Sequence, residues 1–103
     1  MANISLWDKL DMIIRVNLYA TLRDLTGWSS KEFSVEENEL SLRDFILRYL
    51  GDIGERIFKE FYLSGSARYT ILINGVNILM REGLDTKLRD KDTIDIFPPV
   101  AGG

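Results

Sequence analysis

The spacing of apolar residues changes twice along this chain, and that change constrains the fold more than any other feature. Apolar and polar residues alternate over residues 12–18, which predicts a strand with one buried face. Apolar residues recur at helical spacing over residues 41–50, and alternation returns over residues 93–97. Because each segment has one apolar side, we expect the strands and the helix to cover one another in a shared core.

Capping residues mark the ends of the predicted helices. Ser41 and Asp44 form a capping box before the long helix, and Gly51 is its stop signal. Thr21 and Asp24 form the same pattern before a helix of one or two turns that follows the first strand. A second helical pattern covers residues that precede the Ser-Gly-Ser breaker.

The remaining segments complete the order of elements. Residues 31–36 alternate and predict a short strand beside the first, and Asn74-Gly75 between two apolar runs predicts a hairpin. The segregated order predicts one α+β domain with a mixed sheet of about five strands and helices packed on one face. If the first and last strands are central neighbours, they run parallel and the domain is a β-grasp, one of a few topologies that fit.

The composition excludes several kinds of chemistry. The chain contains no cysteine and no histidine, which removes thiolate nucleophiles, disulfides, zinc-thiolate sites and the commonest general base. With 16 acidic and 13 basic residues and no dense basic block, nucleic acid is not an expected partner. The cluster Asp85, Asp90, Asp92 and Asp95 matches no calcium loop, so we interpret it as a solvated turn and expect no metal site.

Residues 1–11 are interpreted as an N-terminal extension to a domain of residues 12–103. They lack the cationic and apolar regions of a signal peptide, and no segment reaches the roughly 20 apolar residues of a membrane span. We therefore expect no membrane contact and a cytoplasmic location.

The chain ends in Phe-Pro-Pro-Val-Ala-Gly-Gly, which leaves the carboxylate of Gly103 as the remaining distinctive group. Gly102 and Gly103 allow close backbone approach to another molecule, and Pro98 and Pro99 limit the freedom of the segment that leaves the last strand. We expect such an ending to enter a narrow channel at low ordering cost.

Strand parity separates two aromatic residues from the core. Tyr19 and Phe97 point opposite to the apolar set that includes Leu18, Ile94 and Ile96, so we expect them on the open face of the sheet. Aromatic side chains on a solvated face are candidate anchors for a partner protein.

Several of these segments resemble the MoaD family, the small subunits of molybdopterin synthase within the MoaD/ThiS ubiquitin-like sulfur carriers. The resemblance covers residues 12–103. It is most specific in the opening IIRVNLYATLRDLTG and the closing DTIDIFPPVAGG, with the capped helix and the Ile-Asn-Gly hairpin between them. It implies the β-grasp fold and a sulfur carrier rather than a catalyst.

The resemblance also implies partners and site residues. An E1-like enzyme would adenylate the carboxylate of Gly103 with ATP, and sulfur transfer would give a thiocarboxylate as the functional modification, with no tightly bound cofactor. A MoaE-like large subunit would use that sulfur on a precursor pterin for molybdenum or tungsten. Gly102 and Gly103 would enter the partner's channel, and Tyr19, Phe97 and, more weakly, Arg23 would contact the partner.

Three alternatives remain at the level of the sequence. The same glycine could be joined to substrate lysines, which would make the chain a protein modifier. The chain could serve as a thiamine-type sulfur carrier. A ubiquitin-like module that binds partners without using its terminus is the third.

Overall fold

The computed structural model describes residues 12–63 and 69–99, which form one mixed five-stranded sheet with helices. The strand order is β2-β1-β5-β3-β4. The strands are β1 (Met12–Leu18), β2 (Ser30–Val35), β3 (Thr70–Ile73), β4 (Val76–Asn77) and β5 (Thr93–Phe97). The helices are α2 (Thr21–Thr26), α3 (Leu42–Tyr49) and α4 (Gly51–Leu63), with two 3-10 turns, η1 (Ile78–Met80) and η2 (Gly83–Asp85).

The first and last strands are parallel neighbours at the centre of the sheet. Val16 lies opposite Ile94 and Leu18 lies opposite Ile96, whereas the other neighbouring strands pair antiparallel. Joining two parallel strands requires a long crossover connection, which here includes α3 and α4. The predicted α+β domain is therefore confirmed. Of the few topologies that fit the sequence, the chain adopts the β-grasp.

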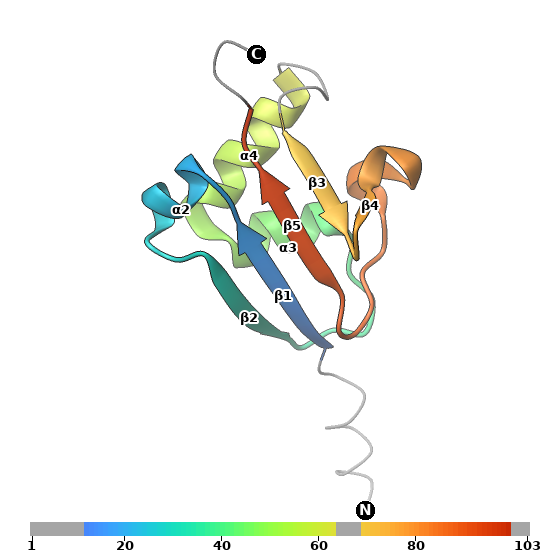
Figure 1. The fold of residues 1–103 in the computed structure, drawn as a ribbon. Helices are drawn as coiled ribbons and strands as arrows, with labels where there is room; N and C mark the ends of the chain where they lie inside the picture. Colours follow the sequence, from blue (N-terminus) through green and yellow to red (C-terminus); the bar gives the residue numbers. More distant parts are fainter. Residues whose placement is uncertain (1–11, 64–68, 100–103) are drawn as a thin grey trace, which may run out of the picture.

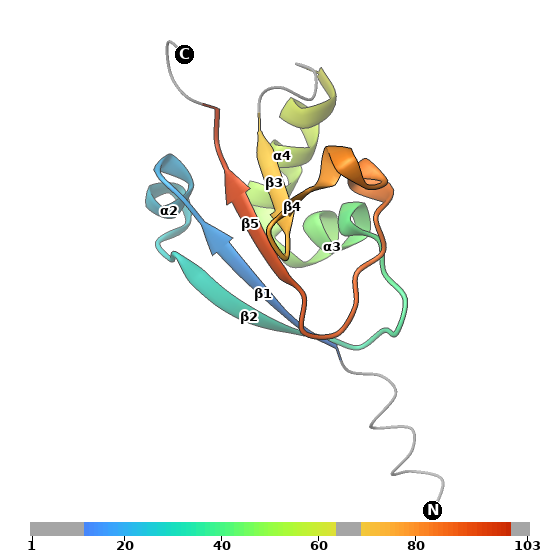
Figure 2. The same cartoon turned by 45° about the vertical axis from the view of Figure 1, so that its right-hand side comes forward.

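Both long helices cover the same side of the sheet. Figures 1 and 2 show α3 and α4 on one face of β1 and β5 in two orientations. Between the layers lies one apolar core, in which the alternating residues of the central strands meet the helices. Fully buried members include Ile14, Val16, Phe45, Ile57 and Ile94. The opposite side of the sheet is called the open face below, and it carries the other half of each alternation.

Local signals fix most of the element ends. The Ser41 hydroxyl oxygen accepts a hydrogen bond from the Asp44 backbone N–H at 3.1 Å, as the capping box predicts. Asn74 and Gly75 both have positive φ, 52° and 83°, which matches the two-residue hairpin turn expected between β3 and β4. The cap predicted at Thr21 is wrong, because Thr21 is already the first helical residue and no side chain caps α2.

A glycine allows α3 and α4 to meet at a short distance. A Cβ built on Gly54 would collide with the backbone carbonyl oxygen of Ile46 and lie 3.0 Å from the Cβ of Leu50. Because a backbone oxygen inside a helix cannot move aside easily, any larger residue at this position must push the two helices apart. Glycine is therefore required at position 54 by the close packing of α3 and α4 and not by the backbone conformation of a turn.

We expect Gly54→Ala to destabilise the protein by about 1–3 kcal/mol, as overpacked core substitutions do. The sign of this stability change is informative, since Gly→Ala at an exposed helix position would stabilise the protein by up to about 1 kcal/mol. Urea unfolding followed by circular dichroism measures the difference. Glu55→Ala, at the next and exposed position, is the control and should shift stability by no more than about 0.5 kcal/mol. An unchanged or higher midpoint for Gly54→Ala would contradict the close approach.

Candidate functional site

The structure brings Tyr19 and Phe97 into contact. Tyr19 directly follows β1 and Phe97 ends β5, and because Leu18 lies opposite Ile96, the two aromatic residues leave the sheet at the same end. Their rings stack with centroids 4.2 Å apart and planes 9° apart. Both side chains are half-buried, whereas Leu18 and Ile96 beside them are buried in the core. Strand parity thus predicts on which face of the sheet Tyr19 and Phe97 lie. Their contact follows from the parallel pairing of β1 with β5.

A tight turn holds Tyr19 in place. The backbone N–H of Leu22 donates to the carbonyl oxygen of Tyr19 at 3.2 Å, which closes a four-residue turn between β1 and α2. Ala20 sits inside it at φ 53° and ψ −129°, a region that residues with a side chain adopt rarely. Buried Leu22 anchors α2 on the core side. The chain therefore turns away from the sheet immediately after Tyr19.

Asp95 connects Tyr19 to the centre of the sheet. Its Oδ1 atom accepts hydrogen bonds from the Tyr19 hydroxyl at 2.8 Å and from Nδ2 of Asn17 at 2.9 Å. Asn17 is the residue directly opposite Asp95 in the parallel pairing of β1 with β5. The hydrogen bond to Asp95, then burial and the carboxylate charge, raise the pKa of Tyr19 above its ordinary value. No local pattern in the sequence indicates this network, because Asp95 is 76 residues from Tyr19 and 78 from Asn17 along the chain.

The other predicted site residues lie around this pair. Pro98 is half-buried and Pro99 is exposed, and they extend the chain from the end of β5. Arg23 is exposed on α2, and its side chain makes no hydrogen bond or ion pair with the residues that the structure describes. Gly102 and Gly103, like the N-terminal extension of residues 1–11, lie outside the described residues.

The four aspartates near the last strand do not form a cluster. Asp92 is buried, and it accepts hydrogen bonds from Nδ2 of Asn74 and from the Arg89 backbone, both at 2.8 Å. Asp90 accepts from the backbone of Ile13, Asp85 pairs with Arg43, and Asp95 lies on the open face. The interpretation as a solvated turn is therefore wrong for Asp92, whose two carboxylate oxygens connect the Asn74-Gly75 turn to the turn that begins at Arg89. Across residues 12–63 and 69–99, no three acidic side chains gather where they could hold a metal ion.

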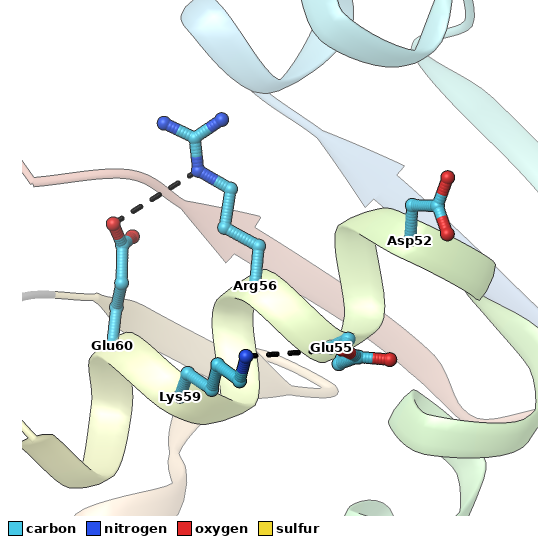
Figure 3. A pocket seen from close by; sticks show the side chains of 5 residues that line it. All are labelled: Asp52, Glu55, Arg56, Lys59 and Glu60. Atoms are coloured by element: carbon cyan, nitrogen blue, oxygen red, sulfur yellow. Dashed lines mark ion pairs between the residues drawn. The ribbon is translucent and has the colours of Figure 1, made fainter.

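A hollow on the outer face of α4 is a second surface feature, separate from the Tyr19–Phe97 pair, and it is lined by charged side chains. Figure 3 shows Asp52, Glu55, Arg56, Lys59 and Glu60 along it. Arg56 pairs with Glu60 and Lys59 with Glu55, each at 3.9 Å and one helical turn apart. Exposed pairs of this spacing stabilise a helix by a few tenths of a kcal/mol. All five residues come from one helix and pair mainly with one another, so this hollow has the character of a solvated helix face.

The described helices also bear on membrane insertion. Within residues 12–63 and 69–99, none combines the length and the apolar character needed to cross a bilayer.

The fold and the site define a small β-grasp protein whose last strand leads into a glycine-ended tail. The ThiS family model matches residues 16–103, and the chain therefore belongs to the ThiS family, the ThiS/MoaD group of ubiquitin-like sulfur carriers. Members of this family are small carrier or modifier proteins rather than catalysts.

Individual relatives match nearly the whole chain. It is 30% identical to small archaeal modifier protein 3 of Haloferax volcanii, over 89% of this chain and 100% of the relative. The solution structure of small archaeal modifier protein 1 from Methanosarcina acetivorans is 33% identical, with a TM-score of 0.67 over 90% of this chain and 98% of that one. A chain of the complex of subunits 1 and 2 of molybdopterin-converting factor from Helicobacter pylori shares the fold, at 23% identity and a TM-score of 0.52 over 89% and 100%.

We expect Asp95→Asn to lower the pKa of Tyr19 toward its ordinary value of 10.0, because it replaces the hydrogen bond from Tyr19 to a carboxylate by a weaker one to a neutral amide and also removes the carboxylate charge. The tyrosinate absorbance during an alkaline titration measures this, and Tyr19→Phe identifies which of the titrating tyrosines is Tyr19. The raised pKa means that the protonated Tyr19 hydroxyl adds to the free energy of unfolding. This stabilisation is complete below the unfolded-state pKa near 10.0 and is lost as the pH rises through the higher pKa of Tyr19 in the folded protein. Identical titrations of the wild type and Asp95→Asn would contradict the role given to the Asp95 hydrogen bond.

Proposed function

We propose that this protein carries sulfur on its C-terminal carboxylate as the small subunit of a molybdopterin synthase. The observation that carries the proposal is the stacked Tyr19–Phe97 pair, which stands at the end of β5 from which the Pro-Pro and Gly-Gly sequence continues. A chain of the ThiS family that has this half-buried aromatic pair at the base of its tail is suited to present Gly103 to another protein. In this proposal the protein acts in the cytoplasm, where ATP supports the activation.

The chemistry begins with the carboxylate of Gly103, which is a poor acyl donor. A carboxylate oxygen attacks the α-phosphorus of ATP on an E1-like enzyme, and pyrophosphate leaves. Hydrosulfide supplied by a sulfur donor then attacks the acyl carbon, AMP leaves with the bonding electrons, a proton is released, and the terminus becomes a thiocarboxylate. The large subunit finally directs this sulfur to a precursor pterin. The chain itself needs no tightly bound cofactor for these steps.

Each site residue has a part in this proposal. Tyr19 and Phe97 supply a flat apolar contact at the rim of the partner's channel, and aromatic side chains are common anchors of interfaces. Pro98 and Pro99 narrow the directions in which the tail leaves the sheet. Gly102 and Gly103 fit a channel too narrow for side chains, and exposed Arg23 on α2 is available for a further polar contact. The name of the Helicobacter pylori complex, between the two subunits of molybdopterin-converting factor, supports a large subunit as the partner.

The proposal predicts a thiocarboxylate at Gly103. The full chain, incubated with ATP, an E1-like enzyme and a sulfur donor, should gain the mass difference of one oxygen replaced by one sulfur, and the large subunit should then convert precursor pterin. A chain that ends at Val100 should do neither, although its described fold is untouched. A chain with a few residues added after Gly103 is the matched control and should also fail. Pterin conversion by the shortened chain would overturn the proposal.

Protein modification is the second candidate function. It is favoured by the two relatives that are 30% and 33% identical, both of which are named small archaeal modifier proteins. In this function the same activated carbonyl of Gly103 is attacked by the amine of a substrate lysine, which forms an isopeptide bond and releases the leaving group. Both functions share the activation step and differ only in the nucleophile that follows.

A modifier should produce conjugates in the cell. An N-terminally tagged chain expressed in its own organism should give a ladder of larger bands on an immunoblot under reducing, denaturing conditions. The ladder should disappear when Gly102 and Gly103 are deleted, because no activated terminus forms. Isopeptide-linked peptides in mass spectrometry identify the acceptor lysines. The absence of any tail-dependent band, together with a thiocarboxylate, would leave sulfur transfer as the function.

A further inference from the structure

One carboxylate at the centre of the open face, that of Asp95, forms no ion pair with a basic side chain of residues 12–63 and 69–99. Asp95 lies in β5, with Asn17 of β1 on one side and Leu72 of β3 on the other. Along its own strand the next residue on the open face is Phe97, whose ring stacks on Tyr19. The side chain is half-buried in this mostly uncharged surrounding.

Arg15, the basic residue that β1 carries on the open face, is already paired. Nη2 of Arg15 contacts Oε2 of Glu32 across β1 and β2 at 2.7 Å. Oδ1 of Asp95 accepts from Asn17 and Tyr19, whereas Oδ2 has neither a hydrogen bond nor an ion pair with the residues that the structure describes. Oδ1 of Asp95 is thus held by β1 and Tyr19, whereas Oδ2 is not a buried atom and has no partner among the described residues.

This arrangement has a physical consequence when a protein docks on the open face. In the free chain, water solvates Oδ2. A docked protein would remove that water, and a carboxylate desolvated without a partner weakens binding. A cationic side chain that reaches Oδ2 reverses the effect, because charge-assisted hydrogen bonds are the strong ones. Only one oxygen is free, so a single N–H of a lysine or an arginine satisfies it.

We propose that Oδ2 of Asp95 binds a lysine or arginine side chain of the E1-like adenylating enzyme when that enzyme docks on the open face. The inference rests on the proposed function, since it assumes that the terminus is activated. Activation precedes both sulfur transfer and conjugation, so the adenylating enzyme must bind the chain in either case. Asn17 and Tyr19 act as positioning residues that hold the carboxylate with Oδ2 outward.

Asp95→Asn tests the charge with little change in shape. The amide oxygen still accepts from Asn17 and Tyr19, but the amide nitrogen takes the place of Oδ2 and points donors at the incoming cation. The affinity for the E1-like enzyme from the same organism, measured by calorimetry, should fall by roughly tenfold or more. Its dependence on salt should also become flatter, because one attraction between opposite charges has been removed.

Matched variants separate charge from folding and from the tail. Glu32→Gln removes another carboxylate of the open face. Because Glu32 already pairs with Arg15 of the same chain, this change should lower the affinity by less than about threefold. Asp95→Glu retains the charge and should recover part of the affinity. Phe97→Arg should weaken binding severely. Urea unfolding of each variant checks that it is folded.

The outcomes distinguish this inference from the function on which it rests. If Asp95→Asn binds the enzyme as the wild type does while removal of Gly102 and Gly103 abolishes the thiocarboxylate, the ion pair is overturned and the carrier function stands. An equal loss for Glu32→Gln, or a loss of affinity for the large subunit alone, would also overturn the assignment to the E1-like enzyme. If the enzyme does not adenylate the wild-type chain at all, both proposals fall.

Discussion

Main-chain hydrogen bonds between β1 and β5 join the two ends of the described chain, and the rest of the structure depends on them. Parallel strands cannot be joined by a tight turn, so the connection must pass over one face of the sheet. That connection includes the apolar sides of α3 and α4, which then cover Ile14, Val16 and Ile94. The same pairing leaves the other face of β1 and β5 without a helix from residues 12–63 and 69–99, and it puts the carboxyl ends of the two strands side by side.

The two faces of the central strands consequently have different tasks. The covered face is uniformly apolar and accounts for stability through burial. The open face holds a short polar network, in which Asn17 and Tyr19 share one oxygen of Asp95. The network and the Tyr19–Phe97 stack restrain the end of β5, from which the tail continues. A rigid base of this kind lowers the entropy lost on binding, which suits the proposed function, in which Gly103 is presented to another protein.

In the proposed complexes, charge and shape contribute differently to the recognition of partners on the open face. The stacked rings offer apolar area, which many partners can use, whereas the free oxygen of Asp95 favours a partner with a cation at one position. Family membership is established by the match over residues 16–103, and members of this family are small carrier or modifier proteins. The two proposed functions, sulfur transfer and conjugation, differ in the nucleophile that would attack the activated carbonyl of Gly103, and that nucleophile belongs to another molecule.

The sequence by itself determined the elements and their faces. Alternation at residues 12–18 and 93–97, the cap at Ser41 and the Asn74-Gly75 turn act between near neighbours in the chain, so their outcome is readable from local spacing. Tertiary structure decided what those faces bring together. The strained turn at Ala20 displaced the cap predicted at Thr21, and Asp92 became a buried clamp instead of a solvated residue. The contact of Tyr19 with Asp95 and Phe97 required strand pairing across most of the chain, because hydrogen bonds between distant segments have no local pattern.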